Sequence, residues 1–409
     1  MTLVPDVARV ALITSRFPFG AKESFLREEI VEISRSCELL VLPALPTREG
    51  ETFADVSARR LRLLSWHVLA AAALESVRAP LAVLRVMATV VSAPRELRDK
   101  CKNLLIFPTA LAAARIVRQQ RIKHVHAYWL AIPATVAYVA ATLNDIAWSA
   151  TGHRYDLVGF NLGETNPRRS TFISSAQFIR TISRQGEERV RRALGRNTPR
   201  VFTEHLGVRL PQTASHAVPN PVFRLLCAAN LERVKGHATL LEALARVVDR
   251  GIDVSCTIAG DGTLRQMLEA QAQALGLSER VHFAGLVPHD RLLAAIQAGV
   301  YDAAILTSID EGPAECEGIP VFLIESMAAG LAVIATRSGA VSELVDGTNG
   351  LLCAPDDRDA VATAIADLAT RPALRAKLGA AGRATVEARF DVRENAARIA
   401  SLILSEVLA

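Results

Sequence analysis

The chain has 409 residues, of which 50% are hydrophobic and 22% are charged, and this composition excludes an intrinsically disordered protein. Its length favours two domains over one. The net charge of +5 hides an asymmetry, because residues 1–205 carry 29 Lys and Arg against 18 Asp and Glu (+11), whereas residues 206–409 carry 18 against 24 (−6).

The first half of the chain predicts an α/β domain with long helices. Strand-like apolar runs lie at 7–14, 37–44, 124–129, 147–151 and 178–183. Residues 124–144 are 21 positions without Lys, Arg, Asp or Glu, but a strand followed by a buried Ala-rich helix explains them better than a transmembrane helix. The N-terminus shows no charged leader, and the six Cys are scattered without CxxC spacing, so we expect reduced thiols and a cytoplasmic protein.

The segment 54–119 is predicted to be largely helical and strongly basic. Residues 59–102 carry nine Lys and Arg against three Asp and Glu, interleaved with apolar side chains that include Trp66 and Met87. Two interpretations fit this pattern: a face that contacts a membrane surface, or an ordinary helix pair with snorkelling arginines. The basic half as a whole predicts an anionic partner, either a phospholipid surface or a lipid-pyrophosphate acceptor, unless its arginines are merely solvated. No motif or aromatic platform for nucleic acid is recognised, so we expect no nucleic-acid partner.

Two loops that follow strands of the first half carry candidate residues. The first loop, FPFGAKE, contributes a predicted acceptor-side set of Phe19, Gly20, Ala21, Lys22 and Glu23. We expect this loop to face a cleft between the two domains. His153 follows the strand at 147–151, where its imidazole can bond a substrate hydroxyl, although an isolated histidine is more often structural.

The second half predicts a parallel sheet that is covered on both faces. Strand-like runs lie at 225–230, 254–260, 281–285, 302–307, 332–336 and 350–353. Helix-like stretches lie between and after them, at 236–249, 263–275, 289–298, 320–329, 339–345 and 357–370. Near-continuous apolar strands that alternate with helices are typical of doubly wound α/β domains, in which ligands bind beyond the carboxyl ends of the strands.

The segment EGIPVFLIE carries the most chemical information. Pro320 suits the first position of a helix that ends near Gly330, so backbone N–H groups around 321–323 are predicted to point out of a helix N-terminus. Such an end binds anions, and a diphosphate fits it well. Glu325 lies in an apolar helix between Ile324 and Met327, where a carboxylate needs a partner such as a ribose diol. Glu317 precedes the helix and can reach sugar hydroxyls.

Other strand-end loops add weaker candidates. In NLERVKGH, Lys235 is placed to balance the charge of a leaving diphosphate, and Gly236 permits close backbone approach. Gly260 lies in a GDG turn at another strand end, which ordinary turn chemistry also explains.

These residues give the chain a resemblance to family-four retaining glycosyltransferases of the GT-B fold. Glu317 and Glu325 match the Glu-x7-Glu signature of that family, and RVHFAGLVP, DAAILTS and SGAVSELVDGTNGLLCAPDD follow the expected order over about 222–388. The first half resembles, more loosely, a subgroup of polysaccharide and capsule assembly. The chain departs from the pattern at Asn230, where the family usually has Arg, and at Ala340, where a second Gly is common.

The resemblance implies two Rossmann-like, doubly wound domains that face a central cleft. It implies catalytic roles for His153, Glu317 and Lys235, with Lys235 on the donor diphosphate, Glu325 on the ribose and Glu317 on the transferred sugar. The implied donor-binding set is Asn230, Arg233, Lys235, Gly260, Val287, Glu317, Gly318, Ile319, Val321, Phe322, Leu323 and Glu325. Within this set, Arg233 would supply the positive charge that the family usually has at position 230, and the backbone around Val287 would contact the nucleobase. The implied domains are 1–210, a linker at 211–221, 222–388, and a C-terminal helix at 389–409 that packs back on the first domain.

The predicted function is transfer of a sugar from a nucleoside-diphosphate sugar to an acceptor hydroxyl, with retention at the anomeric carbon. We identify no DxD-type metal site and no His/Cys cluster, so we expect no metal and no cofactor beyond the nucleotide-sugar co-substrate. The acceptor is either lipid-linked or anionic, or else a soluble natural product, with peripheral contact to the inner face of the membrane in the first case. Two alternatives stay open: a sugar-nucleotide-binding protein without transferase activity, and a nucleotide-sugar epimerase.

Overall fold

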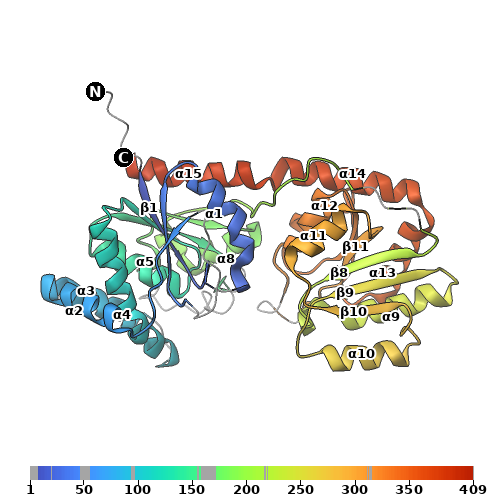
Figure 1. Ribbon diagram of the computed structural model, residues 1–409, viewed down its shortest axis with the longest axis horizontal. Coiled ribbons are helices and arrows are strands. Elements are labelled where there is room, and N and C mark those ends of the chain that lie inside the picture. Colours follow the sequence, from blue (N-terminus) through green and yellow to red (C-terminus); the bar gives the residue numbers. More distant parts are fainter. Residues whose placement is uncertain are drawn as a thin grey trace. The chain divides into compact units, whose positions relative to one another are not determined.

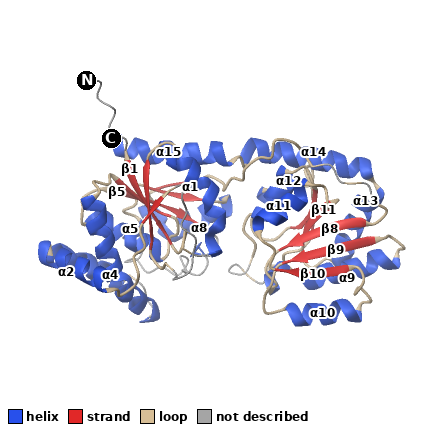
Figure 2. Ribbon diagram, in the orientation of Figure 1, coloured by secondary structure: helices blue, strands red, loops and turns tan. Residues whose placement is uncertain are grey.

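The computed structural model describes residues 8–19, 21–46, 56–93, 97–153, 156–157, 172–215, 218, 220–310, 312 and 316–408. The chain divides into two compact units (Figure 1). Unit 1 comprises Met1–Leu206 together with Val392–Ala409, and unit 2 comprises Gly207–Asp391. Each unit has its own parallel sheet flanked by helices, so the expected α/β class with two doubly wound units is confirmed (Figure 2).

Unit 1 is built on a seven-stranded sheet in the order β3-β2-β1-β4-β5-β6-β7. Its strands are β1 (Arg9–Thr14), β2 (Glu38–Pro43), β3 (Ser57–Ala58), β4 (His124–Ala127), β5 (Ala147–Gly152), β6 (Phe178–Thr181) and β7 (Arg200–Thr203). All neighbouring strands are parallel. Five of these strands match the predicted ones, whereas β3, which has only two residues, and β7 were not predicted.

The helices of unit 1 cover both faces of this sheet. They are α1 (Arg27–Ser34), α2 (Trp66–Arg78), α3 (Pro80–Ser92), α4 (Leu97–Gln119), α5 (Ile132–Thr142), α8 (Arg184–Leu194) and α15 (Val392–Leu408), with 3₁₀ turns at Ala21–Leu26 and Gly195–Asn197. Alternate residues of β1 point to opposite sides: Val10 and Leu12 pack in one core with α1 and α15, and Ala11 and Ile13 pack in another with α4 and α5. The C-terminal helix therefore completes the core of unit 1.

Unit 2 is built on a six-stranded sheet in the order β10-β9-β8-β11-β12-β13. Its strands are β8 (Phe223–Ala228), β9 (Val254–Ala259), β10 (Val281–Gly285), β11 (Ala303–Leu306), β12 (Ala332–Thr336) and β13 (Leu351–Cys353). All are paired in parallel, and each lies within two residues of a predicted strand. The order reverses between β8 and β11, and in open α/β sheets a ligand binds at this kind of switch point.

The helices of unit 2 match the sequence pattern, except that the helix at Pro372–Arg389 was not predicted and one predicted helix does not form. They are α9 (His237–Asp249), α10 (Arg265–Ala274), α11 (His289–Gln297), α12 (Val321–Ala328), α13 (Arg358–Thr370) and α14 (Pro372–Arg389), with a 3₁₀ turn η3 at Arg233–Lys235. The helix expected at 339–345 is wrong, because only the single 3₁₀ turn η4 (Val341–Glu343) forms there. Ser215, in the segment expected to be a linker, is hydrogen-bonded to the carbonyl groups of Ala329 and Ile296, so this part of the chain belongs to unit 2.

Candidate active site

Lys235 is positioned by a tight connection after β8. The 3₁₀ turn η3 ends at Gly236, whose φ of +65° is a left-handed conformation that favours glycine. A Cβ at Gly236 would lie 1.8 Å from the carbonyl oxygen of Thr307, which follows β11. Gly236 thus lets two neighbouring strand ends approach each other, and it places Lys235 beside the residues that follow β11.

Glu317 meets Lys235 directly. The Nζ atom of Lys235 lies 2.5 Å from Oε2 of Glu317, and the side chains are 19% and 7% exposed. Oε2 also accepts a hydrogen bond of 2.9 Å from Ser308 Oγ, while Oε1 accepts one of 3.1 Å from the backbone N–H of Gly318. Three donors from three parts of unit 2 therefore fix the orientation of this carboxylate.

The backbone around Glu317 is fixed by the loop that follows β12. The N–H of Glu317 donates to Ser338 Oγ at 3.0 Å, and the carbonyl of Glu317 accepts from the N–H of Ala340 at 3.1 Å. Gly339 has a φ of +53°, and a Cβ there would lie 2.0 Å from the carbonyl oxygen of Glu317. Ala340 has a φ of −90° and is buried, so the backbone does not need the second glycine that is common in the family at this position.

Helix α12 begins one residue later than the sequence predicts. Pro320 is the N-cap, with an extended ψ of 117°, and Val321 is the first helical residue. The predicted free N–H of Leu323 is a second correction, because it donates to the carbonyl of Pro320 at 3.0 Å. Among the described residues, the N–H groups of Val321 and Phe322 have no hydrogen-bond partner. These two amides stand at the positive end of the helix dipole.

Glu325 lies one turn into α12 and has a partner that the sequence did not reveal. Its Oε1 atom is 2.6 Å from Nε2 of His289, the first residue of α11. The Glu325 side chain is only 11% exposed, whereas that of His289 is 52% exposed. The carboxylate is thus largely withdrawn from solvent, and a solvent-facing imidazole covers one of its oxygens.

The remaining donor-side candidates follow β8, β9 and β10. Asn230 and Arg233 are exposed, and Val287 is half-buried in the connection between β10 and α11. The N–H of Gly260 donates to the carbonyl of Gly285, and a Cβ on Gly260 would lie 1.9 Å from the carbonyl oxygen of Ala229. The structure brings Lys235 and Glu317 into contact; the hydrogen-bond partner of Glu325 in the structure is instead His289.

His153, in unit 1, follows β5 and is buried against Trp129. The two rings lie 4.3 Å apart between centroids with planes tilted by 32°. Burial, with a smaller contribution from the Arg180 cation, lowers the pKa of His153 to about 3, so its imidazole is neutral near pH 7. Its Nε2 atom has no hydrogen-bond partner among the described residues. A neutral ring nitrogen can either donate to a hydroxyl or accept from one.

Asp156 fixes the backbone beside His153. Its carboxylate accepts from the N–H of His153 at 2.7 Å and from the N–H of Leu130. Burial raises the pKa of Asp156 to about 7, against the opposing effect of these backbone donors. Sequence reasoning did not select Asp156 or Trp129.

The predicted acceptor-side loop is fixed by Glu23, which is buried. Its carboxylate accepts from the N–H groups of Arg16 and Phe17, both at 2.6 Å, and from Trp129 Nε1 at 2.6 Å. Glu23 therefore has a structural role that ties this loop to the Trp129 that packs on His153. Phe19 is buried too, Gly20 lies outside the described residues, and Ala21 and Lys22 are described by their backbone alone.

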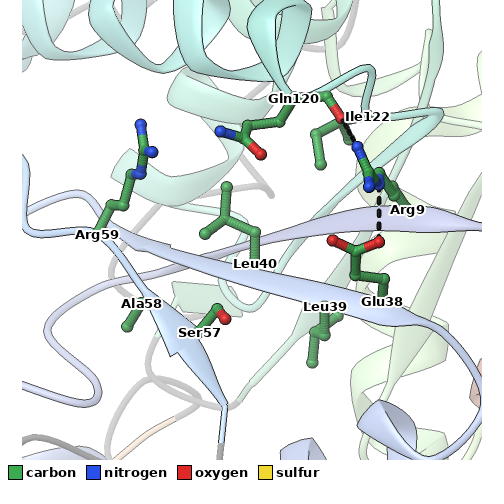
Figure 3. Close-up of a pocket in the computed structure, with 9 residues that line it drawn as sticks. All are labelled: Arg9, Glu38, Leu39, Leu40, Ser57, Ala58, Arg59, Gln120 and Ile122. Atoms are coloured by element: carbon green, nitrogen blue, oxygen red, sulfur yellow. Dashed lines mark hydrogen bonds and ion pairs between the residues drawn. The ribbon is translucent and has the colours of Figure 1, made fainter.

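A cavity in unit 1 lies away from all these residues. It has a volume of about 330 Å³ and is lined by side chains at the amino ends of β1 and β2, including Arg9 and Glu38, which form an ion pair (Figure 3). The candidate residues instead follow the carboxyl ends of strands. Within the described ranges, no group of three or more His, Cys, Asp or Glu side chains is arranged to hold a metal ion.

Two Rossmann-like units with parallel, doubly wound sheets are the architecture of GT-B glycosyltransferases. Residues 210–385 match the family described as "Glycosyl transferases group 1". Unit 2 therefore carries the domain of this family of retaining enzymes, and the chain is a glycosyltransferase that transfers a sugar from a nucleotide-sugar donor. The predicted transferase function is confirmed.

Comparisons with individual proteins agree with this assignment. The chain is 28% identical over 322 residues to a GDP-mannose-dependent α-(1-6)-phosphatidylinositol monomannoside mannosyltransferase of Mycolicibacterium smegmatis, a match that covers 73% of the chain and 81% of the relative. The fold of the chain resembles that of sucrose-phosphate synthase from Thermosynechococcus elongatus, with a TM-score of 0.72 and 19% identity. This match covers 97% of the chain and 98% of the synthase. The fold also resembles that of the Anabaena protein Alr3699/HepE solved with UDP, with a TM-score of 0.70, 17% identity and coverage of 97% and 100%.

Proposed function

We propose that Lys235 and the first amides of α12 bind the pyrophosphate of the donor. The observation that carries this proposal is the contact of 2.5 Å between Lys235 and Glu317, directly before the N-terminus of α12. A partly buried cation, and two N–H groups that have no partner in the described part of the chain, thereby lie at the switch point of the sheet, between β8 and β11. An anion there gains the field of the helix dipole together with charge-assisted hydrogen bonds.

The same groups stabilise the charge that develops during transfer. The bond between the anomeric carbon and the pyrophosphate oxygen breaks, so negative charge collects on the diphosphate. The acceptor oxygen attacks the same face of the sugar, its proton passes to the departing phosphate oxygen, and the anomeric configuration is retained. Lys235 and the N–H groups of Val321 and Phe322 are already in place for that charge, which makes them efficient electrostatic catalysts.

The two acidic residues take different parts of the donor. Glu317, fixed by three donors, presents its carboxylate to hydroxyl groups of the transferred sugar. Glu325 binds the ribose diol, in exchange for or beside its contact with His289. The backbone of Gly260 and Val287 borders the nucleobase, Arg233 adds positive charge, and His153 offers its neutral imidazole to a sugar hydroxyl.

We further propose that the enzyme needs no metal and that its acceptor hydroxyl is carried by a lipid. Lys235 and the α12 amides supply the positive charge that a divalent cation supplies in other sugar transferases. The M. smegmatis relative acts, by its name, on a phosphatidylinositol mannoside, and the basic first half of this chain favours an anionic headgroup. These properties favour a cytoplasmic enzyme at the inner face of the membrane.

A donor-binding test distinguishes a ribose-binding role of Glu325 from a purely structural role. We expect Glu325→Ala to remove nucleotide binding and transfer while it leaves the fold intact, because the change removes a contact to the exposed side chain of His289. The measurements are the rise in Tm with UDP, GDP, ADP or dTDP and the release of nucleoside diphosphate from the donor with phosphatidylinositol mannoside vesicles in EDTA. Glu269→Ala, on the exposed face of α10, is the matched control. Normal nucleotide binding by Glu325→Ala would contradict the proposed role in ribose binding.

A further inference from the structure

We propose that the exposed apolar face of α2, α3 and the start of α4 binds an anionic lipid bilayer. This inference names the surface by which the enzyme would reach the proposed membrane location. It rests on the proposed function only in taking a bilayer as the partner. The face, called here the apolar helical face, consists of Leu64, Trp66, Leu69, Leu74, Val77, Leu81, Leu84, Leu97, Leu104 and Leu105, all of them exposed. Figure 1 shows α2 and α3 at the margin of unit 1, outside the layer of helices that covers the sheet.

Helix α2 is apolar on the side that faces solvent. Its buried residues are Val68, Ala72 and Glu75, which share one side of the helix. The opposite side carries Trp66 and Val77, which are 71% and 81% exposed, with Leu74 between them. A surface helix in water normally turns charged residues outward, so this pattern marks a surface that contacts something apolar.

The acidic side chain of this helix points inward instead. Glu75 is fully buried, and its carboxylate is bonded to Arg118 of α4 and to Arg78 of its own helix. These partners lower the pKa of Glu75 in spite of its burial, so it remains ionised. The carboxylate of Glu75 is thus engaged in ion pairs inside unit 1, and the outer side of α2 carries no acidic side chain.

The rest of the face combines exposed leucines with cations. Leu81 of α3 and Leu97 of α4 are 76% and 75% exposed. The same segment carries exposed cationic side chains, of which Lys102 is paired with Asp99: Arg62, Arg85, Arg98 and Lys102. The sequence from 59 to 102 carries nine Lys and Arg against three Asp and Glu, and this combination of apolar and basic side chains is what binds anionic lipid interfaces.

The charge also decides between a bilayer and a second copy of the chain. A symmetric dimer through this face would bring two identical basic surfaces together, which their mutual repulsion opposes. An anionic headgroup layer has the complementary charge. Among the described residues no single helix is long and apolar enough to cross a membrane, and α2 and α3 meet that test only as a pair bent by 115°. Because the inner sides of both helices pack on α4, the apolar helical face contacts the bilayer from its surface.

The test uses the full-length protein and vesicles of known composition. Binding is measured by flotation with phosphatidylcholine vesicles and with vesicles that contain phosphatidylglycerol as well. We expect binding only to the anionic vesicles, and a loss of at least about tenfold in the double variant Trp66→Ser, Leu81→Ser. Arg85→Gln should weaken binding about fivefold, in line with the contribution of one cation near a charged interface. Met267→Ser removes a half-exposed apolar side chain from α10 in unit 2 and is the matched control.

Three outcomes would overturn the proposal. They are wild-type flotation by the double variant, equal binding to both kinds of vesicle, and a dimer in solution that the double variant converts to a monomer without any vesicle binding. The Tm and its rise with nucleoside diphosphate are measured on the same samples. If the nucleotide response persists while vesicle binding is absent in the wild type, this inference fails and the donor site stands. If vesicles bind but nucleotides do not, the proposed donor site fails instead.

Discussion

Replacing Lys235 by Met tests the stability and the chemistry of the donor site together. The change nearly keeps the length of the side chain and removes the ammonium group, with its charge and its N–H donors. The Glu317 carboxylate, 7% exposed, would then keep two neutral donors, Ser308 Oγ and the N–H of Gly318, and lose its cation. Removing one partner of a fully buried ion pair costs about 3–5 kcal/mol. Because solvent reaches this pair and two donors remain, we expect a loss of about 2–3 kcal/mol in the free energy of unfolding.

A second substitution isolates the cause of that loss. Glu317→Gln removes the negative charge that Lys235→Met leaves unpaired. The double variant should therefore be more stable than Lys235→Met alone, with a coupling free energy of about 1–2 kcal/mol in a double-mutant cycle. Urea denaturation followed by circular dichroism gives all four free energies of unfolding. If the two effects were simply additive, the pair would not stabilise the fold and its contact would be incidental.

The kinetic effect should be larger than the effect on stability. Loss of one preorganised donor to developing negative charge typically costs a factor of about 10²–10³ in kcat. We expect a loss of this size for Lys235→Met, measured as donor-dependent release of nucleoside diphosphate at a temperature where the variant is folded. Lys235→Arg should retain part of the activity, because it restores the charge with a different geometry. A folded Lys235→Met with wild-type kcat/KM would refute the assignment of Lys235 to the leaving group.

Two further predictions concern the framework of the protein. Gly236→Ala should destabilise unit 2 by about 3 kcal/mol or more, because its Cβ would meet the Thr307 carbonyl at 1.8 Å, whereas Gly251→Ala, with a φ of +76° and open space around it, should cost only about 1 kcal/mol in urea denaturation. The second prediction concerns pH, because burial lowers the pKa values of three histidines in unit 1. These are His124, His126 and His153. As the pH drops from about 6.5 to about 4, these histidines become protonated in the unfolded chain before they do so in the folded one. The free energy of unfolding therefore falls over this range. The raised pKa of Asp156 acts in the opposite direction and offsets one proton, so the free energy of unfolding should change by about 2–3 kcal/mol per pH unit near pH 5, and Asp156→Asn should steepen this slope. A flat profile of Tm against pH in this range would contradict the burial of these groups.

The sequence predicted unit 2 closely because buried parallel strands are continuous apolar runs. Strands β10 and β12 have the predicted bounds, and the others differ by at most two residues. The prediction failed where local backbone geometry decides the structure. Gly339 adopts a left-handed conformation beside Glu317, and this turn replaces the expected helix at 339–345 by one 3₁₀ turn.

The candidate site was predictable in its charges but not in their pairing. Glu317, Glu325 and Lys235 stand out by their positions at strand ends and at a helix start. Their contacts depend on which strands are neighbours: β8 and β11 are adjacent although two strands and three α-helices separate them in the chain. His289 carried no signal, because an exposed histidine in the first turn of a helix is ordinary. Trp129 and Asp156 were not selected because their roles depend on tertiary contacts with His153, which the sequence does not show.

The contacts of Lys235 bear on Asn230, which stands where the family usually has Arg. Asn230 is exposed after β8, and the positive charge of the proposed site comes from the partly buried Lys235, five residues further on, and from the α12 dipole. Lys235 is paired with Glu317, so in the proposed site a pyrophosphate competes with a carboxylate for the same ammonium group. On this proposal, donor binding loosens the pair and frees Glu317 for the sugar. The ion pair would thereby couple recognition of the sugar to binding of the phosphate, because each carboxylate contact given up by Lys235 becomes available to a sugar hydroxyl.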